Sequence, residues 1–101
     1  MKYKGIVSPE VSAQILATSS YLDNAREGLG VEFDRDVESV LESISTHPNL
    51  YPREFGPVRR AHISRFKQVL FYVLRGDAIV VLEVRDARRE PPDWGTRGFQ
   101  P

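Results

Sequence analysis

The spacing of apolar residues divides the chain into a helical first half and a strand-forming second half. Val11, Ile15 and Leu22 recur at the intervals expected for one face of an α-helix. A second stripe with helical spacing consists of Phe33, Val37, Val40, Leu41 and Ile44. From residue 58 onward, alternation and short continuous apolar runs replace this pattern, and both are typical of β-strands.

Capping and turn residues predict where these elements begin and end. Residues 3–7 are predicted to form a short strand, and Ser8-Pro9 supplies a helix N-cap followed by proline at the first helical position. We expect the first helix to end at Gly28, and the second to follow the Gly28-Leu29-Gly30 reversal and to end at His47-Pro48-Asn49. Prolines and a glycine in residues 52–57 predict an irregular segment.

The second half predicts three antiparallel strands, over residues 58–63, 69–74 and 79–84. Arg75-Gly76-Asp77 joins the last two strands as a short hairpin turn. Both of these strands are almost continuously apolar, which indicates that they are central and covered by the helix pair. The predicted fold class is therefore α+β, a two-layer sandwich with the element order β-α-α-β-β-β.

The composition is that of a globular protein, with 101 residues, 41% of them hydrophobic and 28% charged. We predict a single domain over residues 1–94 and a flexible C-terminal tail over residues 95–101. No apolar run approaches the ~20 residues of a membrane span, and the N-terminus lacks the apolar stretch of a signal peptide, so we expect a cytoplasmic protein without membrane contact. The chain has no cysteine, no metal-ligand cluster and no phosphate-binding loop, so we expect no metal and no cofactor.

Charge is distributed unevenly although the formal net charge is zero. Residues 1–50 carry 4 basic and 8 acidic side chains, whereas residues 51–101 carry 10 basic and 6 acidic ones. This asymmetry predicts a basic functional face in the second half, while the neutral total is a poor match for a protein that only grips nucleic acid. The candidate members of that face are Arg59, Arg60, Arg65, Lys67, Arg85, Arg88 and Arg89.

Two long segments carry a resemblance to a known family. The string GLGVEFDRDVESVLESISTHPNLYP, followed by VRRAHISRFKQVLFYVLRGDAIVVLEVRDARREPPDW, resembles the RelE/ParE superfamily of bacterial toxins from type II toxin-antitoxin modules. The matching features are Phe33 after a glycine turn, Asn49 to Pro52, Arg59, Arg65-Phe66, Tyr72, and the closing Arg88-Arg89, Pro91 and Trp94. The resemblance implies a helical hairpin packed on a curved antiparallel sheet, which agrees with the fold predicted from periodicity.

The superfamily includes both ribosome-dependent messenger-RNA nucleases and non-enzymatic poisons of DNA gyrase, so the resemblance leaves the mechanism open. For a nuclease, Arg59, Arg65 and Arg88 are expected to stabilise the phosphate, while His62 or an unrecognised group moves protons. Trp94 stands where the nucleases carry a tyrosine or histidine for proton transfer, and an indole cannot exchange a proton near neutral pH. Alternation predicts that His62 points to solvent, and Tyr72 is predicted to pack in the core.

For a binding protein, the residues predicted to contact the target or the antitoxin are Arg60, Lys67, Arg85, Arg88, Arg89 and Trp94. Two alternatives stay open in the segment VRDARREPPDW. Arg88 and Arg89 either bind a partner or pair with nearby acids such as Asp86. Trp94 either contacts a partner or folds back as a lid on the core.

The missing proton-transfer residue and the neutral net charge favour a non-enzymatic protein, and of the non-enzymatic functions we prefer a toxin that inhibits gyrase, as ParE does. The alternatives are a RelE-like messenger-RNA endonuclease acting on the ribosome and an inactive homologue retained for antitoxin binding. In each case a cognate antitoxin is expected to form a hetero-oligomer with the chain. Its helix and strand would cover the sheet edge or the groove of the helical hairpin, with acidic side chains meeting the basic face.

Overall fold

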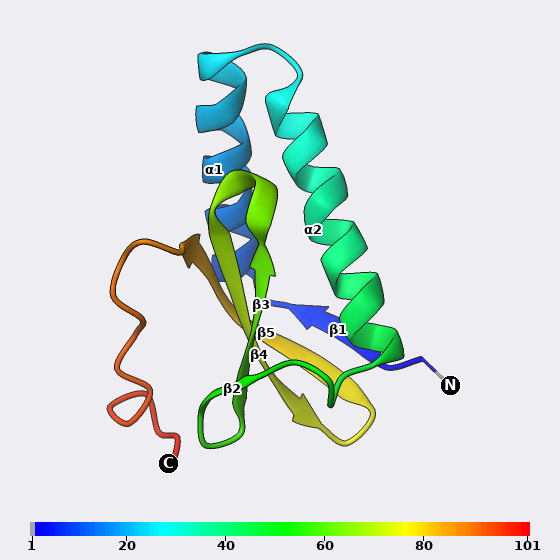
Figure 1. The fold of residues 1–101 in the computed structure, drawn as a ribbon, viewed down its shortest axis with the longest axis vertical. Coiled ribbons are helices and arrows are strands. Elements are labelled where there is room, and N and C mark those ends of the chain that lie inside the picture. Colours follow the sequence, from blue (N-terminus) through cyan, green and yellow to red (C-terminus); the bar gives the residue numbers. More distant parts are fainter. Residues whose placement is uncertain (1) are drawn as a thin grey trace.

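The computed structural model describes residues 2–101 and contains two helices and a five-stranded sheet (Figure 1). The elements are β1 (Lys4–Val7), α1 (Pro9–Ala25), α2 (Leu29–Thr46), β2 (Arg53–Phe55), β3 (Val58–Ile63), a 3-10 turn (Ser64–Phe66), β4 (Gln68–Arg75) and β5 (Ala78–Asp86). The strands lie in the order β1-β5-β4-β3-β2. The predicted α+β class is confirmed. Over residues 2–101, neither helix is long and apolar enough to cross a membrane.

The three antiparallel strands predicted in the second half are confirmed, but the whole sheet is mixed and not antiparallel throughout. The pairs β2–β3, β3–β4 and β4–β5 are antiparallel. β1 pairs parallel with β5, with Lys4 opposite Ala78 and Val7 opposite Val81.

β2 is a strand that the sequence did not predict. Gly56, with a φ of +52°, allows a tight turn between β2 and β3. Pro52 and Pro57 lie just outside β2, so they limit the length of this strand without preventing its pairing with β3.

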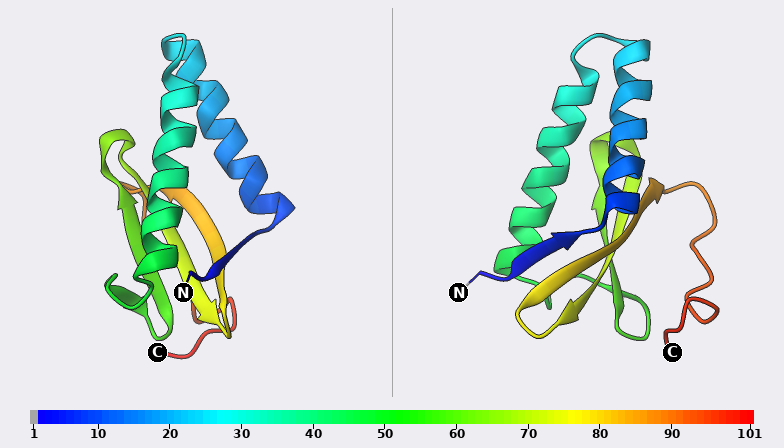
Figure 2. Two further views of the ribbon diagram at one scale, coloured as in Figure 1. Left: turned by 90° about the vertical axis from the view of Figure 1, so that its right-hand side faces the viewer. Right: turned by 180° about the vertical axis from the view of Figure 1, so that it is seen from behind.

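The helical hairpin differs from its prediction at the turn. Ser8 Oγ accepts a hydrogen bond from the N–H of Val11, as expected for an N-cap, but α1 ends at Ala25 and α2 begins at Leu29. Gly30 therefore lies inside α2, where a Cβ atom would come within 2.6 Å of the backbone oxygen of Ser19. Glycine at this position lets the helices touch near the turn, and Figure 2 shows them diverging towards their other ends.

Each face of the sheet has its own core. On one face, α1 and α2 cover side chains that include Leu70, Tyr72 and Ile79. On the opposite face, a smaller core gathers around Phe71 and Trp94. Alternation along β4 sends successive side chains to these two cores, which explains the continuous apolar run of this strand.

The C-terminal residues 92–101, which we call the strap, pack against the face of the sheet that the helices leave open. Trp94 is 2% exposed, and its ring lies 5.1 Å from that of Phe71 and 6.0 Å from that of Phe99. The N–H of Phe99 donates a hydrogen bond of 3.0 Å to the oxygen of Trp94, and Arg97 pairs with Glu83 at 2.8 Å. This packing differs from the flexible tail expected for residues 95–101, because aromatic and ionic contacts hold the segment on the sheet.

Candidate functional site: a basic cleft on the sheet

A cleft of about 190 Å³ lies on the strap side of the sheet, and we call it the basic cleft. Its lining residues are Glu54, Arg60, His62, Val69, Phe71, Arg85, Ala87, Arg89 and Pro91. The strand register brings the polar members together. His62 on β3 lies opposite Val69 on β4, and Val69 lies opposite Arg85 on β5. Arg60 lies two residues before His62, on the same face of β3.

The arginines of the basic cleft are only partly neutralised. Arg60 pairs with Glu54 at 3.4 Å, and Arg85 pairs with Glu83 at 3.0 Å. The Nε of Arg85 is buried and has no hydrogen-bond acceptor within residues 2–101. Arg89 is exposed and forms no ion pair with the other described residues.

Guanidinium groups match the oxygens of phosphates and carboxylates with paired hydrogen bonds. The basic cleft can therefore bind an anionic group, with the exposed and unpaired Arg89 as its most accessible cation and the partly buried Arg85, which pairs with Glu83, beside it. His62 is exposed at the same cleft, as predicted. It is the only histidine among the residues that line the cleft, and its imidazole could transfer a proton.

Two arginines predicted to act with His62 lie elsewhere. Arg59 donates a hydrogen bond of 2.6 Å to the oxygen of Tyr51 and a longer one to the oxygen of Asn49, so it holds the loop after α2. Arg65 pairs with Glu32 on α2 and stacks on the Phe66 ring at 4.9 Å. Because neighbours on a strand point to opposite faces, Arg59 cannot share the cleft of Arg60.

Arg88 and Lys67 also lie outside the basic cleft. The guanidinium of Arg88 binds the carboxylate of Asp86 at 2.6 and 2.9 Å, and its backbone N–H donates to the same group. These hydrogen bonds hold the pKa of Asp86 well below its usual range and raise the pKa of Arg88. Lys67 is exposed in a left-handed turn, with a φ of 55°. Of the adjacent pair Arg88 and Arg89, only Arg89 lines the cleft.

The two aromatic residues considered at the sequence level are both buried. Trp94 occupies the lid position, so its side chain is not an accessible partner contact. The hydroxyl of Tyr72 donates a hydrogen bond of 2.8 Å to the oxygen of Pro48 on the helix side of the sheet. Burial raises the pKa of Tyr72 to about 12, so this hydroxyl keeps its proton.

Replacing Tyr72 by phenylalanine is expected to flatten the loss of stability at alkaline pH. The pKa of Tyr72 in the fold, about 12, exceeds its ordinary value of 10.0, so the folded state holds the proton more tightly than the unfolded state. This contribution is complete below the unfolded pKa and is lost as the pH rises through the folded one. Denaturant unfolding measured between pH 10.0 and about 12 should show that the free energy of unfolding falls more steeply with pH for the wild type than for Tyr72→Phe. Tyr21→Phe changes an exposed tyrosine, so its stability should fall with pH as that of the wild type does. Parallel plots of stability against pH for all three proteins would contradict a raised pKa for Tyr72.

Sequence reasoning missed the acids that hold the cleft arginines. Glu83 interrupts an apolar strand two residues before Arg85, and this spacing places both side chains on one face. Glu54 lies in the segment that was predicted to be irregular, so no register could be assigned to it.

No model of a known protein family matches this chain, and no curated protein matches it significantly.

Proposed function

We propose that this protein is the toxin of a bacterial type II toxin-antitoxin pair, and that it arrests growth by binding DNA gyrase rather than by catalysis. The observation that carries the proposal is the basic cleft, in which Arg60, Arg85 and Arg89 gather and Arg89 is exposed without an ion pair to the described residues. Stability of the fold does not require an unpaired cation beside two further arginines, so a partner with anionic groups is the simplest reason for this arrangement. The choice of gyrase rests on the resemblance to ParE.

The positions of the possible proton-transfer groups support a binding role. Cleavage of RNA through its 2′-hydroxyl needs a base, an acid, and cations for the developing charge. Trp94 is buried, and Tyr72 lies on the other face of the sheet with its hydroxyl bonded to Pro48. A nuclease built on this cleft would therefore have His62 as its one imidazole.

His62 nevertheless favours RNA cleavage as the second candidate function. It lies in the same cleft as Arg60 and Arg85, so a scissile phosphate bound by these arginines would be near an imidazole. In this case Arg60, Arg85 and Arg89 would take the place of Arg59, Arg65 and Arg88 as the phosphate-binding set. His62→Gln would then abolish cutting, whereas it would leave a gyrase inhibitor active.

The helical hairpin offers a surface for the proposed antitoxin. A groove of about 350 Å³ between α1 and α2 has Ile15, Leu16 and Val37 along it, and Asp34 and Glu38 at its rim. An amphipathic segment with basic side chains would complement this groove, whereas the basic cleft would take an acidic segment. The antitoxin would therefore present opposite charges to the two faces.

Two assays with purified protein, freed of antitoxin, test the proposal: gyrase supercoiling with a readout of cleaved DNA, and messenger-RNA cleavage on programmed ribosomes. We expect cleaved DNA to accumulate while the RNA stays intact. Cut RNA that becomes intact with His62→Gln would replace the proposal by the second candidate. No effect in either assay, and no growth arrest on expression, would identify an inactive homologue.

A further inference from the structure

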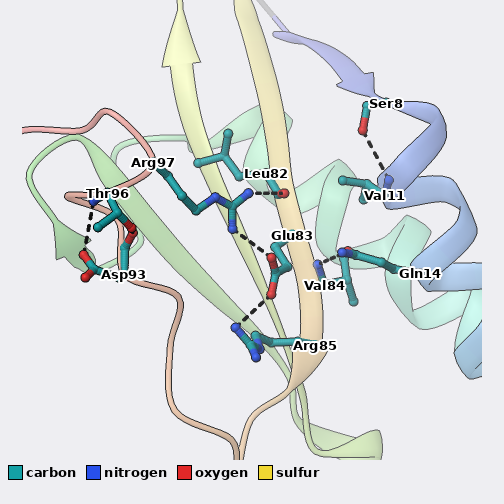
Figure 3. A network of polar contacts seen from close by, with 10 residues as sticks. All are labelled: Ser8, Val11, Gln14, Leu82, Glu83, Val84, Arg85, Asp93, Thr96 and Arg97. Carbon is teal, nitrogen blue, oxygen red and sulfur yellow. Dashed lines mark hydrogen bonds and ion pairs between the residues drawn. The ribbon is translucent and has the colours of Figure 1, made fainter.

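The strap supplies a second partner to the acid that neutralises the basic cleft. Figure 3 shows the carboxylate of Glu83 between two guanidinium groups. One oxygen forms an ion pair with Arg85 at 3.0 Å, and the other accepts a hydrogen bond of 2.8 Å from Arg97. Glu83 is therefore shared between an arginine of the cleft and an arginine of the strap.

Several contacts hold Arg97 in this position. Its guanidinium stacks on the Trp94 ring at 4.7 Å from the centroid, and it also reaches the backbone oxygen of Leu82. The end of the strap passes so close to Gly56 that a Cβ atom there would lie 1.8 Å from the oxygen of Gln100. The strap is thus seated between the β2–β3 turn and the apolar face of the sheet, and Arg97 is placed by that seating.

We propose that Arg97 is a positioning residue that sets the anion affinity of the basic cleft by sharing Glu83 with Arg85. With Arg97 in place, the single negative charge of Glu83 is shared by two cations. The positive charge of Arg85 is then only partly neutralised and can attract a phosphate-type anion. Without Arg97, the whole charge of Glu83 acts on Arg85. The side chain of Glu83 is only 15% exposed, so water screens this change weakly. The inference rests on the proposed role of the basic cleft in binding.

The test measures the binding of inorganic pyrophosphate to the full chain at low ionic strength by titration calorimetry. Arg97→Gln is expected to weaken binding about three- to tenfold, the range of one partly screened charge interaction. Arg97→Lys retains the charge and should bind nearly as well as the wild type. Arg75→Gln is the matched control, because it removes one positive charge from the exposed β4–β5 turn, outside the residues that line the cleft.

A double-mutant cycle separates this role from a general loss of charge. Glu83→Gln should raise the affinity for pyrophosphate, and Arg97→Gln should then have little further effect. The backbone N–H of Phe99, which donates to the oxygen of Trp94 when the strap is seated, should keep its protection from hydrogen exchange in Arg97→Gln. If that variant unseats the strap, the rise expected for Glu83→Gln alone still tests the inference.

Three results would overturn the inference: equal losses for Arg97→Gln and Arg75→Gln, an undiminished effect of Arg97→Gln in the Glu83→Gln background, or no binding of pyrophosphate by the wild type. These measurements do not involve gyrase, ribosomes or cells. The cleft could therefore bind pyrophosphate as expected while the protein proves not to be a toxin, and the two failures can be told apart.

Discussion

Replacing Trp94 by alanine should lower the free energy of unfolding by about 3–5 kcal/mol, the usual cost of removing a large buried aromatic side chain. The indole is 2% exposed and joins Phe71 on the sheet to Phe99 on the strap, so its loss leaves a cavity and releases the strap. A domain of this size has a total stability of roughly 5–15 kcal/mol, so the variant should be close to unfolding. Urea unfolding followed by far-ultraviolet circular dichroism measures the change without using tryptophan emission.

Two control variants make this result specific. Trp94→Phe should cost less, because an aromatic ring remains and the indole Nε1 has no hydrogen-bond partner within residues 2–101 to lose. Tyr21→Ala removes an aromatic ring that is 73% exposed and should change stability little. If Trp94→Ala were as mild as Tyr21→Ala, the strap would contribute little to the fold.

Under the proposed toxin function, reversing the charge of Arg89 should abolish growth arrest, whereas reversing that of Arg88 should weaken it much less. Arg89 lines the basic cleft and has no ion pair with the described residues, so glutamate there would repel an acidic or phosphate-bearing target. Arg88 is already neutralised by Asp86 and lies outside the cleft. Target affinity should fall about tenfold or more for Arg89→Glu. Growth after induction, and direct binding to the target, measure the difference.

Arg75→Glu serves as the control, because it makes the same change of charge at an exposed turn away from the cleft. All three variants should melt near the wild-type temperature, since the substituted side chains are exposed. Equal losses of toxicity for Arg88→Glu and Arg89→Glu would show that a diffuse charge, and not the cleft, makes the contact.

Elements fixed by local chemistry were predictable from the sequence. Ser8 and Pro9 start α1 because a cap and an N1 proline need no tertiary partner, and the strand at residues 58–63 was predicted at its observed bounds. The parallel pairing of β1 was not predictable, because an isolated strand carries no signal for the direction or identity of its neighbour. Gly30 was read as part of a turn, since its packing against Ser19 depends on another helix.

The sequence indicated which residues belong to the candidate site better than it indicated which of them lie together in space. The basic character of the second half identified Arg60, Arg85 and Arg89, which the basic cleft does bring together. Alternation alone could have separated Arg59 from Arg60, because adjacent residues on a strand face opposite sides. The contact of Arg97 with Glu83 was not predictable, since a short segment after two prolines has no periodicity that indicates where it packs.

The parallel pairing of β1 with β5 also has a consequence for the order of folding. Lys4 and Val7 find their partners at Ala78 and Val81, so this edge of the sheet closes a loop that contains both helices and three strands. Such long-range pairing is slow to form, because the chain loses the entropy of loop closure before the strand contacts provide any stabilisation. During synthesis, α1 and α2 can form early as a local hairpin, while Ile6 and Val7 wait without a sheet partner until β5 has emerged. β1 is therefore expected to be among the last elements to gain protection from hydrogen exchange during refolding.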